Sequence, residues 1–160
     1  MNICFRKKII FIVFLFFSTP LFGMEIKNKL GVSIGYPYGS IRYGLSNKNV
    51  IEIRLAYGEN IFVFGGRFYF LFYTDKRLNF YISPEIDGLT FVSRYTHGEG
   101  CILGSFSGFE YFLKNNFSIN MDIGLAYITV WSREEDVIVS GSNIILNTGI
   151  TFYFKLCKQR

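Results

Sequence analysis

Charged residues, histidine and cysteine are all scarce in this sequence. Charged side chains make up 18% of its 160 residues, against roughly 25% in an ordinary soluble domain. There is one histidine, and the three cysteines are well separated, whereas a metal site needs three or four converging ligands. Too few cysteines are present for a disulfide framework. We therefore expect neither a metal site nor a cofactor.

Long hydrophobic runs are also missing beyond the N-terminus. No run there approaches the roughly 18 apolar residues of a membrane-spanning helix, although 50% of the chain is hydrophobic. An apolar chain without long apolar runs is typical of alternating β-strands. Its length is that of one domain.

The first 23 residues have the pattern of a secretory signal peptide. Arg6, Lys7 and Lys8 precede an apolar core at 9–17, and a break at 18–20 leads to Gly23 at a small-residue cleavage site. A retained membrane helix is the alternative, but the apolar core is short for a span. We expect export of residues 24–160 as a single domain.

Removal of that segment also changes the charge of the chain. It takes three of the 17 basic residues and leaves 14 against 12 acidic ones, so the net charge falls from +5 to +2. No basic cluster with interleaved aromatic residues remains. We therefore expect no nucleic-acid partner.

A period of two is clearest over residues 62–72. Phenylalanines occupy even positions and a mixture of small, charged and apolar residues the odd ones: Phe62, Phe64, Phe68, Phe70 and Phe72 against Val63, Gly65, Arg67, Tyr69 and Leu71. This period predicts a strand with two different faces.

Similar alternation predicts eight strands between residues 29 and 155. We expect them near 30–36, 40–45, 51–57, 62–72, 78–87, 103–113, 117–127 and 143–154. Pro84 predicts a bulge in the fifth strand, because proline cannot donate to a ladder. The segments 88–100 and 132–141 are expected to be the two long loops.

Side-chain volume decides which face looks outward. The interior of an eight-stranded barrel is just wide enough for side chains to fill, so the aromatic face is too bulky to lie inside. The glycine-rich face fits there, and the aromatic face then contacts lipid. The expected fold is all-β: an eight-stranded antiparallel up-and-down transmembrane β-barrel, preceded by a helical signal peptide. A soluble, exported ligand-binding barrel would require the opposite facing.

The inward face carries charges of both signs, namely Arg42, Glu52, Arg54, Arg67, Glu85, Glu110 and Asp122. A buried charge is costly unless it is paired and hydrogen-bonded. These residues are expected to form either a polar core that holds the barrel in one register or a gated ion path. The crowded interior favours the polar core.

Turn lengths orient the barrel, because transmembrane barrels have short periplasmic turns and longer outer loops. Aromatic residues expected near the outer interface are Tyr36, Tyr57, Tyr127 and Trp131. Candidates for contacts through the outer loops are Arg94, Tyr95, His97, Glu99, Arg133, Glu134, Glu135 and Asp136.

The hairpin pattern, the signal peptide, Gly-Phe-Glu-Tyr-Phe at 108–112 and a last strand ending Thr-Phe-Tyr-Phe at 151–154 are similar to a known family. Over about residues 29–155 the chain resembles the small OmpA/OmpX-like eight-stranded outer-membrane barrels of Gram-negative bacteria. The resemblance implies location in the cell outer membrane, contact with its lipid, insertion by the barrel-assembly machinery and a monomeric state. One departure is that residues 155–160 follow the last aromatic residue, where the family's assembly signal usually ends.

These features predict a non-enzymatic protein with a structural or surface-interaction role, such as adhesion or envelope integrity. A lipid-modifying enzyme is the alternative, with His97, Ser93 and Glu99 as its candidate residues. Catalysis would require the base and the nucleophile to lie within hydrogen-bond reach of each other. No second pattern in the sequence brings these residues together.

Overall fold

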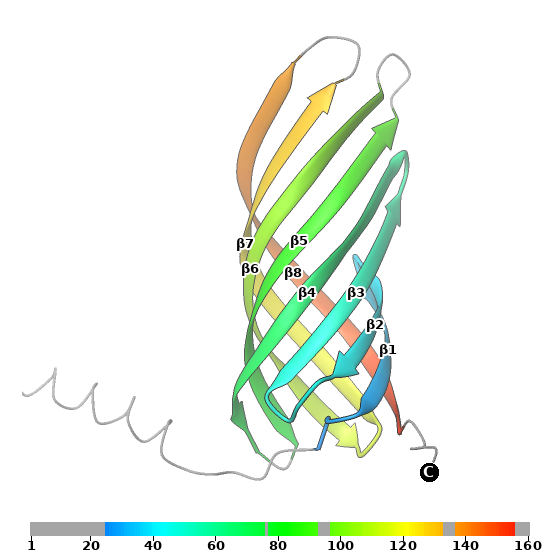
Figure 1. Ribbon diagram of the computed structural model, residues 1–160, viewed down its shortest axis with the longest axis vertical. Coiled ribbons are helices and arrows are strands. Elements are labelled where there is room, and N and C mark those ends of the chain that lie inside the picture. The colour runs from blue at the N-terminus through cyan, green and yellow to red at the C-terminus, as the bar shows by residue number, and fades with distance from the viewer. Residues whose placement is uncertain (1–24, 76, 93–96, 133–136, 156–160) are drawn as a thin grey trace, which may run out of the picture.

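The chain forms one closed sheet of antiparallel strands (Figure 1). The computed structural model describes residues 25–75, 77–92, 97–132 and 137–155, so the expected signal peptide lies outside the described residues. The eight strands are β1 (Lys29–Tyr36), β2 (Gly39–Gly44), β3 (Asn49–Gly58), β4 (Ile61–Thr74), β5 (Leu78–Val92), β6 (His97–Lys114), β7 (Phe117–Ser132) and β8 (Ile138–Lys155).

Closure follows from the pairing of the first strand with the last. Each strand pairs with the next in sequence, and β1 pairs with β8 from Lys29 opposite Lys155 to Tyr36 opposite Thr148. The predicted all-β, eight-stranded antiparallel barrel is confirmed. Among the described residues, no helix is long and apolar enough to cross a membrane.

The two faces of β4 show why this sequence forms such a barrel. Phe64 and Phe70 are 52% and 50% exposed, whereas Arg67 is 4% exposed. Successive side chains of a strand point to opposite faces, so the even-numbered phenylalanines point outward. Large apolar residues are exposed in this way on all eight strands.

The two ends of the barrel differ. We call one the short-turn end, where connections 45–48, 75–77 and 115–116 lie together with the beginning of β1 and the end of β8. We call the opposite one the extended end. The strand ends at Gly58, Val92 and Ser132 and the strand starts at Ile61, His97 and Ile138 lie there.

Strand length divides the barrel into two parts. β1, β2 and β3 have 8, 6 and 10 residues, whereas β5 to β8 have 15 to 18. The β1–β2 hairpin therefore ends well below the tops of β5 to β8 (Figure 1). In the closed half β1 and β2 complete the wall. In the extended half, which includes residues 138–147 of β8, they do not.

These lengths correct the expectation of two long loops at 88–100 and 132–141. β5 continues to Val92, β6 begins at His97, and β8 begins at Ile138. The alternation there is carried by small and polar residues such as Thr90 and Ser140. Hydrophobic contrast is weak in such segments, so the sequence pattern fails to mark them as strands.

The bulge expected at Pro84 is also corrected. β5 continues through Pro84, which lies opposite Ser105 of β6. The register shift between β4 and β5 falls at Leu71 and Tyr73 instead.

The interior contains two apolar clusters. The short-turn cluster consists of Ile26, Val50, Tyr69, Leu71, Tyr81, Phe112 and Tyr153. The extended cluster consists of Val63, Leu89, Ile102, Phe106 and Ala126. The interior is therefore less polar than the glycine-rich inward face predicted, because several large aromatic residues point into it.

Candidate functional site

Eight ionisable side chains form a charged layer between the two clusters. Alternation on six strands directs them inward, and each is at most 5% exposed: Arg42, Glu52, Arg54, Arg67, Glu85, Asp87, Glu110 and Asp122. The seven that the sequence predicted thus come together inside the barrel. The eighth, Asp87, was not among them.

Strand register places four of these residues in one row of alternating sign. Arg42 of β2 lies opposite Glu52 of β3, which lies opposite Arg67 of β4. Arg67 in turn lies opposite Glu85 of β5. Opposite charges at directly paired positions stabilise a sheet, so this row supports the pairing of four neighbouring strands.

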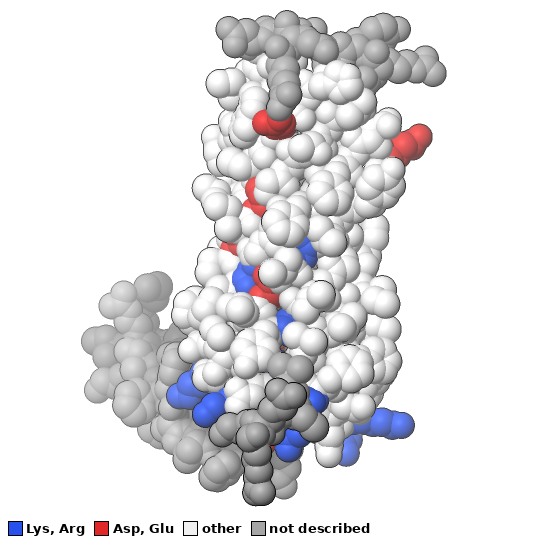
Figure 2. Space-filling model, turned by 45° about the vertical axis from the view of Figure 1, so that its right-hand side comes forward, with Lys and Arg blue, Asp and Glu red and all other residues white. Residues whose placement is uncertain are grey.

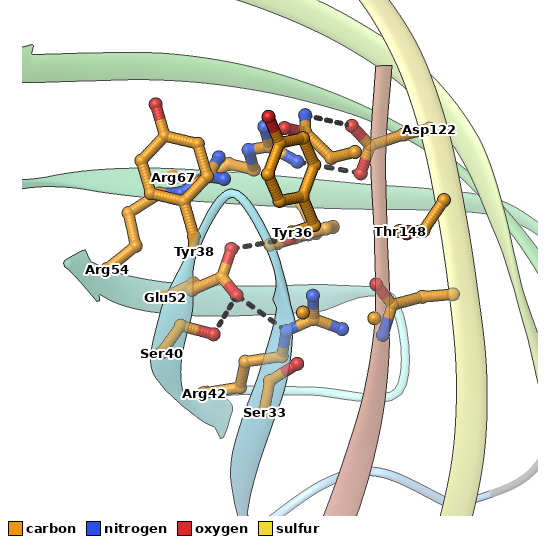
Figure 3. A pocket seen from close by; sticks show the side chains of 15 residues that line it. Ser33, Tyr36, Tyr38, Ser40, Arg42, Glu52, Arg54, Arg67, Asp122 and Thr148 are labelled. Carbon is orange, nitrogen blue, oxygen red and sulfur yellow. Dashed lines mark hydrogen bonds and ion pairs between the residues drawn. The ribbon is translucent and has the colours of Figure 1, made fainter. Parts of the chain in front are cut away.

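The part of the layer nearer the short-turn end centres on Glu52. Arg42 donates from Nε to Glu52 Oε1 over 2.7 Å, and Ser40 donates to the same oxygen. Tyr69 donates its hydroxyl to Oε2 of Glu52 over 2.5 Å. Figure 3 shows Glu52 between Ser40 and Arg42. Both carboxylate oxygens therefore have donors, as a buried carboxylate requires.

Glu110 extends this group to β6, β7 and β8. Arg42 Nη1 lies 3.7 Å from Glu110 Oε1. Ser118 and Tyr153 donate to that oxygen over 2.7 and 2.8 Å. One guanidinium thus lies between two carboxylates.

Arg67 joins opposite sides of the lumen. Its Nε donates to Glu85 Oε2 over 2.6 Å, and its Nη1 donates to Asp122 Oδ2 of β7 over 2.8 Å. Arg54 also donates to Glu85 Oε2. The Arg67 guanidinium lies 4.2 Å from the centre of the Phe106 ring, within cation–π range. This one side chain links the charged layer to the extended cluster.

Neutral groups complete the network around Asp122. Tyr81 donates its hydroxyl to Asp122 Oδ2 over 2.9 Å, and Asn147 donates from Nδ2 to Oδ1 over 2.6 Å. Sequence analysis did not single out these partners, because the alternation that places a tyrosine or asparagine inward does not show what it contacts.

Charge in the layer is not balanced. Three guanidinium groups face five carboxylates. Among the described residues, no cation lies within ion-pair distance of Asp87. Its Oδ2 accepts a hydrogen bond from the Tyr38 hydroxyl over 3.3 Å. Asp87 Oδ1 and Glu85 Oε1 are buried without a hydrogen-bond partner. The inward position of Asp87, two residues after Glu85 on the same strand, was the signal that could have identified it.

Close packing leaves little free space around the charged layer. A β-carbon on Gly65 would clash with the Asp87 carboxylate, so glycine is required there. The cavity lined by Tyr38, Arg42, Arg54 and Asp122 has a volume of about 20 Å³, roughly enough for one water molecule. The described residues form no group of three or more potential metal ligands.

The predicted loop residues fall into two groups. Arg94, Tyr95, Arg133, Glu134, Glu135 and Asp136 lie outside the described residues. His97 and Glu99 belong to β6, which corrects their assignment to a loop; they lie opposite Val92 and Thr90 of β5. Ser93, the candidate nucleophile, is also outside the described residues.

The four predicted interface aromatics do not lie at one level. Tyr36 lies opposite Thr148 of β8, and Trp131 lies opposite Ile138. These two positions of β8 are 148 − 138 = 10 residues apart, about 33 Å along the strand. Tyr57 ends the short β3, and Tyr127 lies opposite Ser142. The expectation placed all four near one interface, but β7 and β8 extend well beyond the end of β1, so these residues lie at different levels.

Comparison with known proteins gives one informative similarity. No protein-family model and no curated protein matches the sequence. Among solved structures, the N-terminal β-barrel domain of Pseudomonas aeruginosa OprF is similar, with a TM-score of 0.56 and 14% sequence identity over 80% of this chain and 98% of that chain. At this identity the likeness concerns the fold alone. The chain therefore shares its barrel architecture with the OprF domain, in agreement with the fold that the OmpA/OmpX-like resemblance implied.

Proposed function

We propose that this chain is a non-enzymatic outer-membrane barrel protein with a filled interior and a structural or surface-interaction role. The proposal rests on the distribution of side chains, which is the reverse of that in a water-soluble protein. Large apolar residues face outward, while the charged layer is buried. Exposing such a surface to water costs roughly 25 cal/mol per Å². Lipid removes this cost, and a closed barrel satisfies its backbone groups without water.

Location in the outer membrane is supported by two further observations. The pattern of residues 1–23 predicts export. The shared architecture with the OprF barrel domain agrees with a membrane barrel. Lipid would then contact the outward face, and the barrel-assembly machinery would insert the chain.

A structural role is supported by how the lumen is filled. The charged layer joins six strands by ion pairs between side chains that are at most 6% exposed. Barrels with open aqueous channels have about 16 strands, whereas this barrel has eight. A polar core that fixes the register accounts for these contacts better than a gated ion path does.

A surface-interaction role is supported by the extended half. Residues 138–147 of β8 pair with β7 alone, because β1 ends opposite Thr148. An unpaired strand edge is a template on which an extended segment of another protein can add a strand. Ile138 and Val139 of this edge strand are 72% and 58% exposed. Partners at the extended end thus have both backbone groups and apolar side chains to contact.

The decisive experiment is gel mobility of the membrane fraction with and without boiling. We expect a detergent-extracted barrel that migrates differently before and after heating, because the closed sheet resists unfolding by the detergent. Recovery of the protein in the soluble fraction, with one mobility in both samples, would contradict the proposal. Single-channel recording in planar bilayers then tests the filled interior, where steady conductance would contradict it.

A further inference from the structure

Charged residues outside the lumen are separated by end. Six described cations lie at the short-turn end and form what we call the basic rim: Lys27, Lys29, Lys48, Arg77, Lys114 and Lys155. Glu25 and Asp75 are the described carboxylates there, and six minus two leaves an excess of four positive charges. The described charges at the extended end are Glu59 and Glu99. Figure 2 shows blue side chains around the lower end and red ones near the upper end.

The rim takes its cations from strand ends around the whole barrel. Lys29 begins β1, Lys114 ends β6 and Lys155 ends β8, while Lys48 lies in the β2–β3 turn and Arg77 directly precedes β5. All except the half-buried Lys29 are exposed. In Figure 2 several of these blue side chains project away from the wall on both sides. The positive charge is therefore a ring and not a single patch.

Compensation of these lysines within the described part of the chain is weak, although Glu25 attracts Lys29. None of the ion pairs among the described residues includes a rim lysine. Lys29 lies directly opposite Lys155 across the β1–β8 pairing, and like charges at such positions destabilise a sheet. An external anion would remove this repulsion.

The basic rim borders the apolar wall. Phe154 is adjacent to Lys155 and 55% exposed, and Phe117 lies opposite Lys114. The Phe117 and Phe152 rings pack with centroids 4.6 Å apart. A lysine beside such a wall can lay its aliphatic stem along apolar surface while its ammonium reaches the headgroup layer.

We propose that the basic rim binds anionic phospholipid headgroups in the leaflet at the short-turn end. The inference rests on the proposed membrane location and adds a lipid class to it. A phosphodiester lipid such as phosphatidylglycerol supplies the missing negative charge, and its acyl chains cover the adjoining phenylalanines. A soluble polyanion would supply the charge but leave the apolar border without a partner. Basic residues close to a membrane surface attract anionic lipid by electrostatics of this kind.

The test compares three forms of the full chain by native mass spectrometry in detergent with equal amounts of dioleoyl phosphatidylglycerol and dioleoyl phosphatidylcholine. One variant combines Lys27→Gln, Lys48→Gln, Lys114→Gln and Lys155→Gln. The matched control carries arginine at the same four positions and keeps the charge. We expect the wild type and the arginine control to retain phosphatidylglycerol over phosphatidylcholine on the order of tenfold, and the glutamine variant to retain the two nearly equally.

Equal retention of the two lipids by the wild type would overturn the inference, as would an unchanged preference in the glutamine variant. Binding of poly-aspartate by a wild type without lipid preference would assign the rim to a soluble polyanion instead. If the glutamine variant fails to fold, the salt dependence of the wild type decides: the preference must fall between 50 and 500 mM salt, because salt screens exposed charges. A wild type whose gel mobility changes on heating but which shows no lipid preference would contradict only this inference. A wild type whose mobility does not change on heating would contradict the proposed function.

Discussion

The closed half and the extended half of the barrel share the strands β5 to β8 but differ in the residues on their outward faces. In the closed half, outward positions of β7 such as Ile119 and Met121 are apolar and 41% and 39% exposed. In the extended half, outward positions of β7 and β8 include Thr129, Ser140 and Ser142. The outward face thus changes from apolar to more polar along the strands.

The interior changes along the strands as well. Ion pairs from β2 to β7 stabilise the closed half, whereas side chains of the extended cluster stabilise the inner face beyond them. The comparison teaches that one strand can carry an apolar outward face at one end and a more polar outward face at the other. Four sets of substitutions test this difference.

The largest effect is expected at the charged layer. Arg67→Ala removes the one ion-pair partner of Asp122 among the described residues and one of the two partners of Glu85. It is expected to cost about 3–5 kcal/mol, because it leaves the buried Asp122 carboxylate unpaired. The free energy of unfolding, measured from gel mobility in urea, checks this. Arg67→Lys, which keeps the charge, is the control. Equal losses in both variants would show that packing and not charge determines the effect.

A charge on the outward face separates the two halves. Met121→Arg in the closed half, opposite Thr148, is expected to cost about 2–4 kcal/mol if it lies near the bilayer midplane. Ser142→Arg in the extended half is expected to change stability by less than about 1 kcal/mol, because arginine near or beyond the interface costs little. Unfolding from lipid vesicles measures both. Similar costs would place the two halves in one environment.

Proline on β8 tests the unpaired edge. The main-chain N–H of Tyr153 points to the β7 side of β8, where it donates to the carbonyl oxygen of Asn116 over 2.8 Å. The main-chain N–H groups of even-numbered β8 residues therefore point toward the β1 side. Ile150→Pro removes a bond to β1 and is expected to cost about 1–3 kcal/mol.

Ser142→Pro is the matched change, because it has the same orientation on β8 but no β1 partner. We expect a smaller loss, since proline is tolerated on strand edges. Thermal midpoints of the gel shift compare the two variants. A larger loss at Ser142 would indicate that this edge is paired.

The smallest change is expected at the boundary between the halves. Asp87→Asn replaces a buried carboxylate that has no ion-pair partner among the described residues. We expect a gain of about 1 kcal/mol in the free energy of unfolding, because a neutral amide is less costly to bury. Destabilisation would show that the charge has a partner after all. Glu85→Gln is the contrasting variant and is expected to destabilise, because two arginines lose the negative charge that they share.

The closed half could be predicted from sequence because its alternation contrasts phenylalanine with glycine and arginine. The period of two places Phe64 outward and Arg67 inward without knowledge of any partner. The volume available in an eight-stranded barrel then decides the facing. Strand number, closure and the inward direction of the charged residues all follow from these two arguments.

The extended half could not be predicted because its strands lack that contrast. Thr90 and Ser140 are as common in loops as in strands, so the strands predicted for β5, β6 and β8 were shorter than those observed. The partners of each charge were also beyond prediction. Asp122 meets Arg67 across the lumen, and the distance across a barrel depends on the tilt and register of every strand between them.

The alternating row formed by Arg42, Glu52, Arg67 and Glu85 has a consequence for errors during assembly. A hydrophobic pattern with a period of two detects a slip of one residue, which would turn every apolar side chain inward. It cannot detect a slip of two. The row can, because moving β3 by two residues against β4 would bring Arg54 opposite Arg67 in place of Glu52. Repulsion between like charges thus disfavours misaligned barrels in which every apolar side chain would still face outward.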